Sequence, residues 1–322
     1  MPAHYPHDTR ETADFTARLT TLVGAARVSA GTSLAPLTTF KVGGPADWLV
    51  TTESADDVRG VVRAASDAGV PITVLGGGSN VLVADAGVRG VVIRMKGGSV
   101  RAVDDARVRA DAGVTINGLV RWTIGRGLKG IEAWAGTPGS VGGAVRGNAH
   151  FRGRLISELI VQVELMSPSG DLATVESSSM EFGYDRSRVQ TTGEIVISAD
   201  FRVGPGEPTA LRAVARQSLA FRKGTQPLES ASAGCIFQNP DPGVDRVPAG
   251  IPPSAGALVD RAGLKGGREG GAIVSPTHAN FIVNDGTASA SDIKRLIARC
   301  HDTVRARFGV ALREEIVYLG EW

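Results

Sequence analysis

A run of three glycines follows an apolar segment and is suited to hold a phosphate group. Gly76, Gly77 and Gly78 come directly after a predicted strand over residues 71–75, and Ser79 and Asn80 follow them. Consecutive glycines expose backbone N–H groups that can cradle a pyrophosphate, and the two polar side chains add donors. The spacing is neither the Rossmann fingerprint nor a Walker loop, so a dinucleotide site here requires a different fold. A tight turn explains the run equally well.

A second glycine-rich segment is more specific. It reads Gly136-Thr137-Pro138-Gly139-Ser140-Val141-Gly142-Gly143-Ala144-Val145, and Asn148 follows it. A Pro-Gly turn followed by small residues leaves a flat backbone surface that can lie against a ring system without side chains in the way. A glycine-rich crossing of two strands is the structural alternative.

The two cysteines differ in their surroundings. Cys300 falls in the apolar stripe of a predicted helix, so we expect it to be a small core residue, whereas Cys235 lies in a polar, loop-like segment. Two cysteines make no disulfide framework, which is typical of a reducing compartment. No group of His, Cys and Asp has the spacing of metal ligands, so we expect no metal.

Composition excludes several classes of protein. The 322 residues suit two or three packed units, and 42% of them are hydrophobic. Lys and Arg number 35 against 33 Asp and Glu, without long blocks of one sign, so we expect no nucleic-acid partner. No apolar run approaches the roughly 20 residues of a membrane span. The polar segment 1–14 has no apolar signal-peptide centre, and we expect a cytoplasmic protein with a loose leader.

The elements that must position these residues follow from apolar periodicity. We expect helices over 54–69 (capped by Ser54), 115–124, 208–222 and 292–308. We expect strands over 71–75, 91–94, 107–110, 160–166, 194–201 and 315–319. Residues 204–206 resemble a linker, and 224–271 a loop-rich region. Because helices and strands mix in irregular order, the fold class is predicted as α+β rather than a doubly wound sheet.

Several ordered motifs resemble one known family. They are Thr39-Phe40-Lys41-Val42-Gly43-Gly44-Pro45-Ala46, the two glycine segments, Phe182-Gly183-Tyr184, Arg222-Lys223-Gly224-Thr225-Gln226-Pro227-Leu228, Ser232-Ala233-Gly234-Cys235-Ile236-Phe237-Gln238-Asn239-Pro240, Ala255 to Lys265, Arg268-Glu269-Gly270-Gly271-Ala272, His278-Ala279-Asn280-Phe281-Ile282-Val283-Asn284 and Leu312-Arg313-Glu314-Glu315-Ile316. In this order, from about residue 30 to 320, they are similar to the MurB family of UDP-N-acetylenolpyruvoylglucosamine reductases.

The resemblance implies a domain organisation. It implies a flexible leader over 1–30, an FAD-binding domain of the vanillyl-alcohol-oxidase type over 31–205, a smaller α+β substrate-binding domain over 206–310 and a C-terminal strand over 311–322. The residues it implies for FAD binding are Gly76, Gly77, Gly78, Ser79, Asn80, Gly136, Thr137, Gly139, Ser140, Gly142, Gly143 and Asn148.

The resemblance also implies a reaction in cell-wall precursor synthesis. NADPH-reduced FAD would add a hydride to the enolpyruvyl ether of a UDP-sugar, and protein groups would stabilise the developing charge and deliver a proton. We expect a monomer that acts on this small molecule, without membrane or nucleic-acid partners. The alternatives are a flavin oxidoreductase of the same fold with another substrate, and a flavin-binding module that has lost turnover.

Three residues are the catalytic candidates by this resemblance. Cys235 replaces the serine that donates the proton in better-known members, and Glu315 matches a catalytic glutamate that helps to polarise the substrate carboxylate. The family arginine lies in Tyr-Arg-x-Ser, whereas this chain has Tyr184-Asp185-Arg186-Ser187. We therefore predict Arg186 as the catalytic arginine, with Arg188 as the second candidate. A surface salt bridge from Arg186 to Asp185 is the structural alternative.

The remaining candidates would bind the UDP-sugar. Arginine suits a diphosphate because its donors form a planar fork. The set is Tyr184, Arg222, Gln226, Gln238, Asn239 and Arg268. We expect His278 and Asn280 to be hydrogen-bonding residues that stabilise loops. The segment 148–153, Asn-Ala-His-Phe-Arg-Gly, departs from the usual Asn-Ala-Gly-Ala-Tyr-Gly, which is expected to alter the rim of the pocket.

Overall fold

The computed structural model describes residues 9–322 and divides into two compact units. Unit 1 contains the chain up to Thr32, Ala46–Gly77 and Arg89–Ala220; unit 2 contains Ser33–Pro45, Gly78–Val88 and Phe221–Trp322. Unit 2 thus includes two N-terminal segments that the sequence-based division assigned to the FAD-binding domain. Both units mix helices with strands, as the predicted α+β class requires.

The first layer of unit 1 is a four-stranded sheet with two helices. The strand order is β1-β2-β5-β3, formed by β1 (Val28–Ser33), β2 (Pro45–Thr52), β5 (Val88–Met95) and β3 (Ile72–Leu75). Helix α2 (Ala55–Asp67) begins as predicted, because the Ser54 hydroxyl accepts a hydrogen bond from the Asp57 N–H at 3.1 Å. Its predicted apolar stripe is buried. Of the four residues of β3, only Leu75 is buried.

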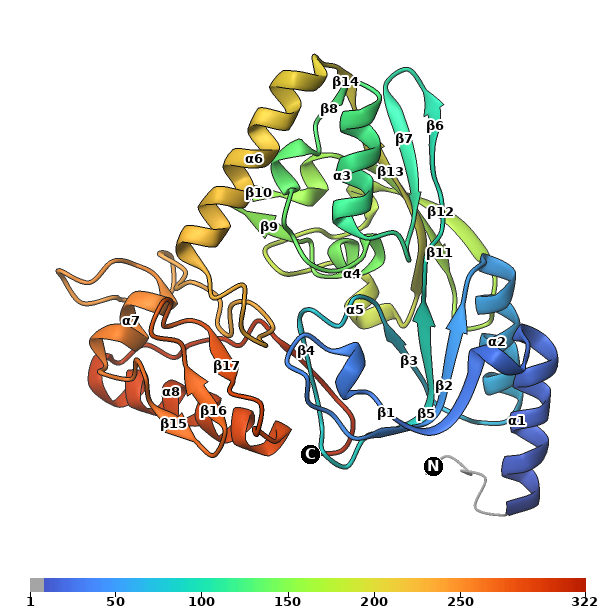
Figure 1. Ribbon diagram of the computed structural model, residues 1–322, viewed down its shortest axis with the longest axis horizontal. Helices are drawn as coiled ribbons and strands as arrows, with labels where there is room; N and C mark the ends of the chain where they lie inside the picture. The colour runs from blue at the N-terminus through green and yellow to red at the C-terminus, as the bar shows by residue number, and fades with distance from the viewer. Residues whose placement is uncertain (1–8) are drawn as a thin grey trace. The chain divides into compact units, whose positions relative to one another are not determined.

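From residue 9 onward, the chain is more ordered than the flexible leader expected over 1–30; residues 1–8 of that leader lie outside the described residues. Residues Thr9–Val23 form helix α1, which lies beside α2 (Figure 1). Phe15, Leu19 and Val23 recur at helical spacing and are buried, and Trp48 Nε1 donates to the Thr16 hydroxyl at 2.9 Å. This apolar stripe begins at Phe15, directly after the polar first 14 residues.

The second layer of unit 1 is an antiparallel sheet of five strands in the order β12-β11-β13-β7-β6. The strands are β12 (Leu172–Glu176), β11 (Ile160–Met166), β13 (Ile195–Arg202), β7 (Arg107–Asp111) and β6 (Val100–Asp104). Helices α3 (Ile116–Gly125) and α4 (Val141–Arg146) share a hydrophobic core with one face of this sheet (Figure 1). This core supports the second glycine-rich segment, because α4 is part of that segment.

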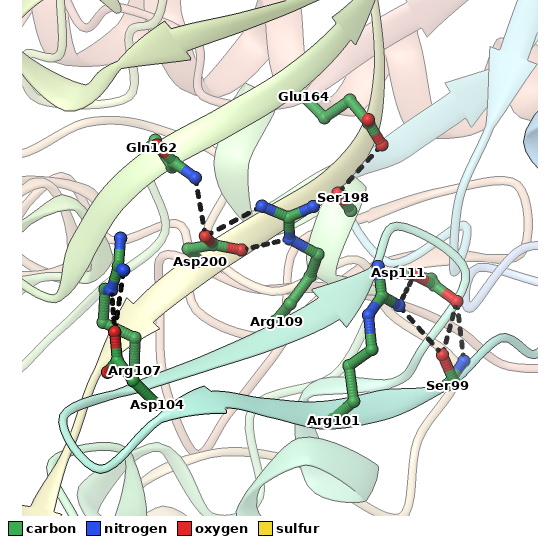
Figure 2. A network of polar contacts seen from close by, with 10 residues as sticks. All are labelled: Ser99, Arg101, Asp104, Arg107, Arg109, Asp111, Gln162, Glu164, Ser198 and Asp200. Carbon is green, nitrogen blue, oxygen red and sulfur yellow. Dashed lines mark hydrogen bonds and ion pairs between the residues drawn. The ribbon is translucent and has the colours of Figure 1, made fainter.

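The opposite face of the five-stranded sheet carries a layer of polar contacts (Figure 2). Along β7 the side chains alternate: Val108 and Ala110 are buried in the core, and Arg109 points to the polar side. Arg109 binds the Asp200 carboxylate through two hydrogen bonds of 2.5 and 3.0 Å, and Gln162 donates to the same carboxylate at 2.8 Å. Asp200 is only 1% exposed, so the free-energy cost of burying its carboxylate must be offset by these partners.

Arg109→Ala should therefore lower the free energy of unfolding by about 3 kcal/mol, since it leaves a buried carboxylate without its ionic partner. Arg101→Ala on the same face is the matched control. Its partner Asp111 is 35% exposed, and the loss should stay below about 1 kcal/mol. Urea unfolding of both variants measures the difference; equal losses would contradict the account.

Unit 2 is built around a three-stranded antiparallel sheet in the order β15-β16-β17. The strands are β15 (Arg268–Glu269), β16 (Ala272–Val274) and β17 (Ile282–Asn284), and helices α7 (Ala255–Arg261) and α8 (Ala290–Phe308) complete the core. Strand β18 (Val317–Leu319) pairs in parallel with β4 (Val81–Val83), which joins the end of the chain to the first glycine loop. The sequence predicted α8 and β18 but placed α7 in a loop-rich region, because this helix is only seven residues long.

Cys300 is a core residue, as predicted. It is 1% exposed on α8, and burial raises the pKa of its thiol to about 12.

The remaining elements are β8 (Leu128–Lys129), β9 (His150–Phe151), β10 (Arg154–Leu155), α5 (Val189–Thr192), β14 (Gly204–Pro205), α6 (Pro208–Thr225) and five short 3-10 helices. None of the helices described has the length and apolar content that spanning a membrane demands.

Candidate active site

The two glycine-rich loops meet within unit 1, although about 60 residues separate them. A Cβ atom on Gly77 would lie 2.5 Å from the Gly139 Cα, and one on Gly76 would lie 2.7 Å from the Ser140 Oγ. Contacts this short exclude any side chain at Gly77, so the backbones themselves pack together. In unit 2, Gly78 is just as constrained: its Cβ would lie 2.0 Å from the Leu37 carbonyl oxygen.

The second loop differs from the flat surface that the sequence suggested. Ser140 begins the short helix α4, and its hydroxyl accepts a hydrogen bond from the Gly143 N–H at 3.4 Å. Gly142 packs against the end of β7, where a Cβ would lie 2.9 Å from the Ala112 Cβ. The small residues of this segment thus allow a helix to approach the sheet closely.

Asn117 on α3 holds the second loop in place and was missed by the sequence analysis. Its Oδ1 accepts a hydrogen bond from the Gly136 N–H at 2.7 Å, and its Nδ2 donates to the Thr137 carbonyl at 3.3 Å. No local pattern marks this residue, because its partners lie about 20 residues away. The contact fixes the loop at Gly136, which has a φ of +82°.

The Asn148 side chain is enclosed by the protein and bonded to its backbone. Its side chain is fully buried; Nδ2 donates to the Gly183 carbonyl at 2.7 Å, and Oδ1 accepts from the Ser157 N–H at 3.1 Å. These bonds tie the segment after α4 to the turn over 183–186. We therefore interpret Asn148 as a residue that supports this turn, and its predicted contact with FAD stays a prediction.

The two candidate arginines, at the end of the turn over 183–186 and just after it, have different partners. Gly183 and Arg186 exchange backbone hydrogen bonds of 3.1 and 3.2 Å. The Arg186 side chain is 67% exposed and pairs with Glu181 at 3.1 Å, so the alternative of a salt bridge to Asp185 is wrong. Arg188 is held by the Glu194 carboxylate through two bonds of 2.9 Å each. Of the two, Arg186 is thus the more available for another partner.

Asp185 turns toward His150 instead. The distance from Asp185 Oδ1 to His150 Nδ1 is 3.2 Å, and the Tyr184 hydroxyl lies 3.3 Å from His150 Nε2. The rings of His150 and Tyr184 are 4.6 Å apart between centroids. Both departures from the family pattern, at 150 and at 185, therefore meet in one cluster.

In unit 2 the backbone brings Cys235 and Glu315 together. The Glu315 N–H donates to the Ile236 carbonyl at 2.8 Å, and Gln238 N–H donates to the Arg313 carbonyl at 2.8 Å. On the other side of this segment, the Asn280 side chain bonds both the N–H and the carbonyl of Phe237, at 3.0 and 2.7 Å. The predicted role of Asn280 as a hydrogen-bonding residue is confirmed.

Comparison with known proteins agrees with these motifs. Residues 46–176 match the model of an FAD binding domain, and residues 226–319 match the C-terminal domain of UDP-N-acetylenolpyruvoylglucosamine reductase. The reductase of Heliobacterium modesticaldum is 39% identical over 88% of each chain, and that of Anaeromyxobacter dehalogenans is 39% identical over 90% of this chain and 84% of its own. The chain belongs to the UDP-N-acetylenolpyruvoylglucosamine reductase family.

A solved structure supports the same assignment. The MurB crystal structure from Thermus caldophilus is 34% identical, with a TM-score of 0.76 over 91% of this chain and 99% of the other. The recognition from sequence motifs, the α+β fold with an FAD-binding domain and the assignment as an FAD-dependent oxidoreductase are confirmed. A same-fold enzyme with another substrate is not favoured.

The glycine loops of this reductase-family chain fit the pyrophosphate of FAD. Within unit 1, among the residues described, the backbone N–H groups of Gly76, Gly77, Gly139 and Ser140 donate no hydrogen bond. Buried or half-buried N–H groups need a partner, and a diphosphate accepts several at once. The donor set therefore suits the cofactor that the family implies.

Asn80 links the first glycine loop to Glu315, the predicted catalytic glutamate. Its Nδ2 donates to the Glu315 carbonyl at 3.1 Å, and its own carbonyl accepts from the Val317 N–H at 3.0 Å. Within unit 2, the side chain predicted to bind FAD thus also fixes the backbone at Glu315. The neighbouring Glu314 accepts a hydrogen bond from Tyr318, whose pKa is raised mainly by burial and also by this contact.

Arg222 is the most buried of the predicted UDP-binding residues. It lies in the last turn of α6 and is 6% exposed, and burial lowers its pKa to about 10. A charge interaction with Cys235 acts in the opposite direction and raises this pKa, so the two side chains are neighbours in unit 2. A guanidinium this buried favours an anionic partner.

The other predicted UDP-binding residues are less enclosed. Arg268 is 55% exposed and pairs with Asp285 at 3.1 Å, and the exposed Asn239 accepts a bond from the Ala255 N–H at 3.1 Å. Gln226 follows α6, and Tyr184 is 44% exposed in unit 1. Their contacts with substrate, like those of Gln238, stay predictions.

Gly77→Ala should abolish FAD retention, because its Cβ would collide with the Gly139 backbone and separate the two loops. Gly125→Ala is the matched control: no atom lies within 4 Å of a Cβ placed there, on α3, and FAD should remain bound. The absorbance ratio of flavin to protein in the purified variants measures this. Full FAD content in Gly77→Ala would contradict the proposed contact.

Proposed function

We propose that the chain reduces UDP-N-acetylglucosamine enolpyruvate to UDP-N-acetylmuramate in peptidoglycan precursor synthesis, with NADPH as the reductant and FAD as the hydride carrier. The observation that carries the proposal is the pairing of the Cys235 segment with Glu315 in a chain of this family. We expect a monomer that works in the cytoplasm.

Bound FAD would supply the hydride chemistry, and the chain's own residues would manage charge and protons. Hydride addition to the far carbon of the enolpyruvyl ether leaves negative charge on its neighbour, delocalised into the carboxylate. We assign Cys235 as the acid that protonates this second carbon. Glu315 and Arg186 would polarise the substrate carboxylate.

The surroundings of Cys235 support its assignment as the acid. Gly234, with a φ of +83°, precedes it, and the Ile236 and Phe237 backbone after it is held on both sides. A thiol held in this way keeps a fixed position relative to Glu315. Arg222, its buried neighbour, offers a positive charge that an anionic substrate would neutralise.

The test compares two half-reactions of the FAD-loaded protein. Cys235→Ala should still let NADPH bleach the flavin, but reoxidation by the enolpyruvyl substrate should slow by about 100-fold or more. Cys235→Ser should keep substantial activity and should lose any alkaline decline caused by thiol ionisation. Cys300→Ala, at the buried cysteine, should reoxidise like the wild type.

Stopped-flow absorbance separates the outcomes. Wild-type protein whose reduced flavin is not reoxidised by UDP-N-acetylglucosamine enolpyruvate would refute the proposed function. Wild-type turnover together with normal reoxidation in Cys235→Ala would refute only the assignment of the proton donor.

A further inference from the structure

One charged side chain lies within the two glycine-rich segments, and the proposed catalytic set does not use it. Segments 71–80 and 136–148 contain no Lys, His, Asp or Glu, and Arg146 is their one arginine. The backbone N–H groups of the glycine loops carry only partial charge. A diphosphate carries full negative charge, and the planar fork of an arginine matches phosphate oxygens. Arg146 therefore has the chemistry that the glycine loops lack.

The Arg146 guanidinium has no hydrogen-bond or ionic partner among the described residues. Its side chain is partly buried, and burial alone lowers its pKa, with no nearby carboxylate acting against it. Two acidic side chains of the adjoining segment pair elsewhere. Glu181 lies 3.1 Å from Arg186, and Glu194 lies 2.9 Å from Arg188. A cation in these surroundings favours an anion that a ligand supplies.

The backbone of Arg146 is fixed by the segment that follows the turn over 183–186. The Arg146 carbonyl accepts a hydrogen bond of 2.6 Å from the Ser187 hydroxyl and one of 2.9 Å from Gln190 Nε2. Ser187 is only 1% exposed, so this anchor lies inside the protein. The end of α4 from which the guanidinium extends is thus held in place, which lowers the entropy cost of binding a ligand there.

Helical spacing places Arg146 on the same side of α4 as Gly143. Residues three apart on a helix are neighbours on its surface, and the Cα–Cβ bond tilts toward the N-terminus, here toward Gly143. The apolar residues of α4 are buried in the core, whereas Gly143 is exposed. A Cβ atom on Gly76 would lie 3.8 Å from the Gly143 nitrogen. Arg146 is therefore on the side of α4 where the two glycine loops meet.

We propose that the Arg146 guanidinium binds the diphosphate of FAD and adds a full positive charge to the backbone donors of the two glycine loops. It is a cofactor-binding residue outside the set that the sequence motifs implied. The charge favours a flavin that carries phosphate over the flavin ring system alone. The proposal rests on the FAD carrier of the function proposed above, and it requires neither the UDP-sugar nor NADPH.

The proposal predicts a loss of affinity that is specific to the phosphates. Arg146→Met keeps an unbranched side chain and removes the charge, so FAD should bind about tenfold or more weakly, as for a lost hydrogen bond to a charged group. Riboflavin has the same ring system without phosphate, and its affinity should change by less than about twofold. Titration of the full-length, flavin-free protein, followed by flavin fluorescence, gives both dissociation constants.

Two further variants serve as controls. Arg63→Met removes the same charge from α2 of unit 1, where the Arg63 side chain is 56% exposed, and should leave both affinities unchanged. Arg146→Lys keeps the charge but not the planar fork, so it should lose less FAD affinity than Arg146→Met.

Three results would overturn the proposal. The first is an unchanged FAD affinity in Arg146→Met; weaker binding of the enolpyruvyl ligand to that variant would then assign the guanidinium to the substrate. The second is an equal loss for FAD and riboflavin in both the Met and the Lys variants, which would make Arg146 a structural residue. The third is an equal loss of FAD affinity in Arg63→Met.

Failure of the proposed function looks different from failure of this proposal. Wild-type protein would then still bind FAD more tightly than riboflavin, and Arg146→Met would still reduce that preference. Its reduced flavin, however, would not be reoxidised by UDP-N-acetylglucosamine enolpyruvate.

Discussion

The candidate site depends on one local constraint, the need of the buried Phe237 backbone for hydrogen-bond partners. Phe237 is 2% exposed, and an unmade backbone hydrogen bond at such a position costs about 1–3 kcal/mol. Asn280, itself 3% exposed, satisfies both the N–H and the carbonyl. Since Ile236 also accepts from Glu315, the same short segment fixes Cys235 and Glu315 together.

A second constraint is the approach of backbone to backbone at the glycine loops. Gly77 and Gly139 come so close that no side chain fits between them, and Asn117 holds the neighbouring Gly136. Among the described residues of unit 1, the N–H groups of Gly76, Gly77, Gly139 and Ser140 donate no hydrogen bond, so the close packing leaves these donors available for a ligand. The same close packing of glycine backbones therefore holds the loops in place and keeps their N–H groups accessible to a phosphate.

Local sequence signals were sufficient for much of the fold. The Ser54 cap and apolar stripe of α2, strand β11, helix α8 and the buried Cys300 all followed from periodicity and capping. The ordered motifs also identified the family and its FAD-binding domain. These features depend on residues that are close together along the chain.

Features that depend on distant partners were not predictable in the same way. The helix α1 is stabilised by packing against α2, and Asn117 and Asn148 each bond to backbone groups in other segments. The sequence placed Arg186 beside Asp185 but could not show that the turn directs Asp185 to His150 and Arg186 to Glu181. Glu181 and Asp185 both have a positive φ, +51° and +52°, and no local sequence pattern indicated these conformations.

The most direct test of this account is the effect of Asn280→Ala on reoxidation of the NADPH-reduced, FAD-loaded protein by UDP-N-acetylglucosamine enolpyruvate. We predict that FAD content and flavin reduction stay near wild type while reoxidation slows by about tenfold or more, because Cys235 and Glu315 lose their shared support. Thr303→Ala, which removes one exposed hydrogen bond on α8, should reoxidise like the wild type. Wild-type reoxidation in folded Asn280→Ala would contradict the claim that this backbone pairing positions the catalytic groups.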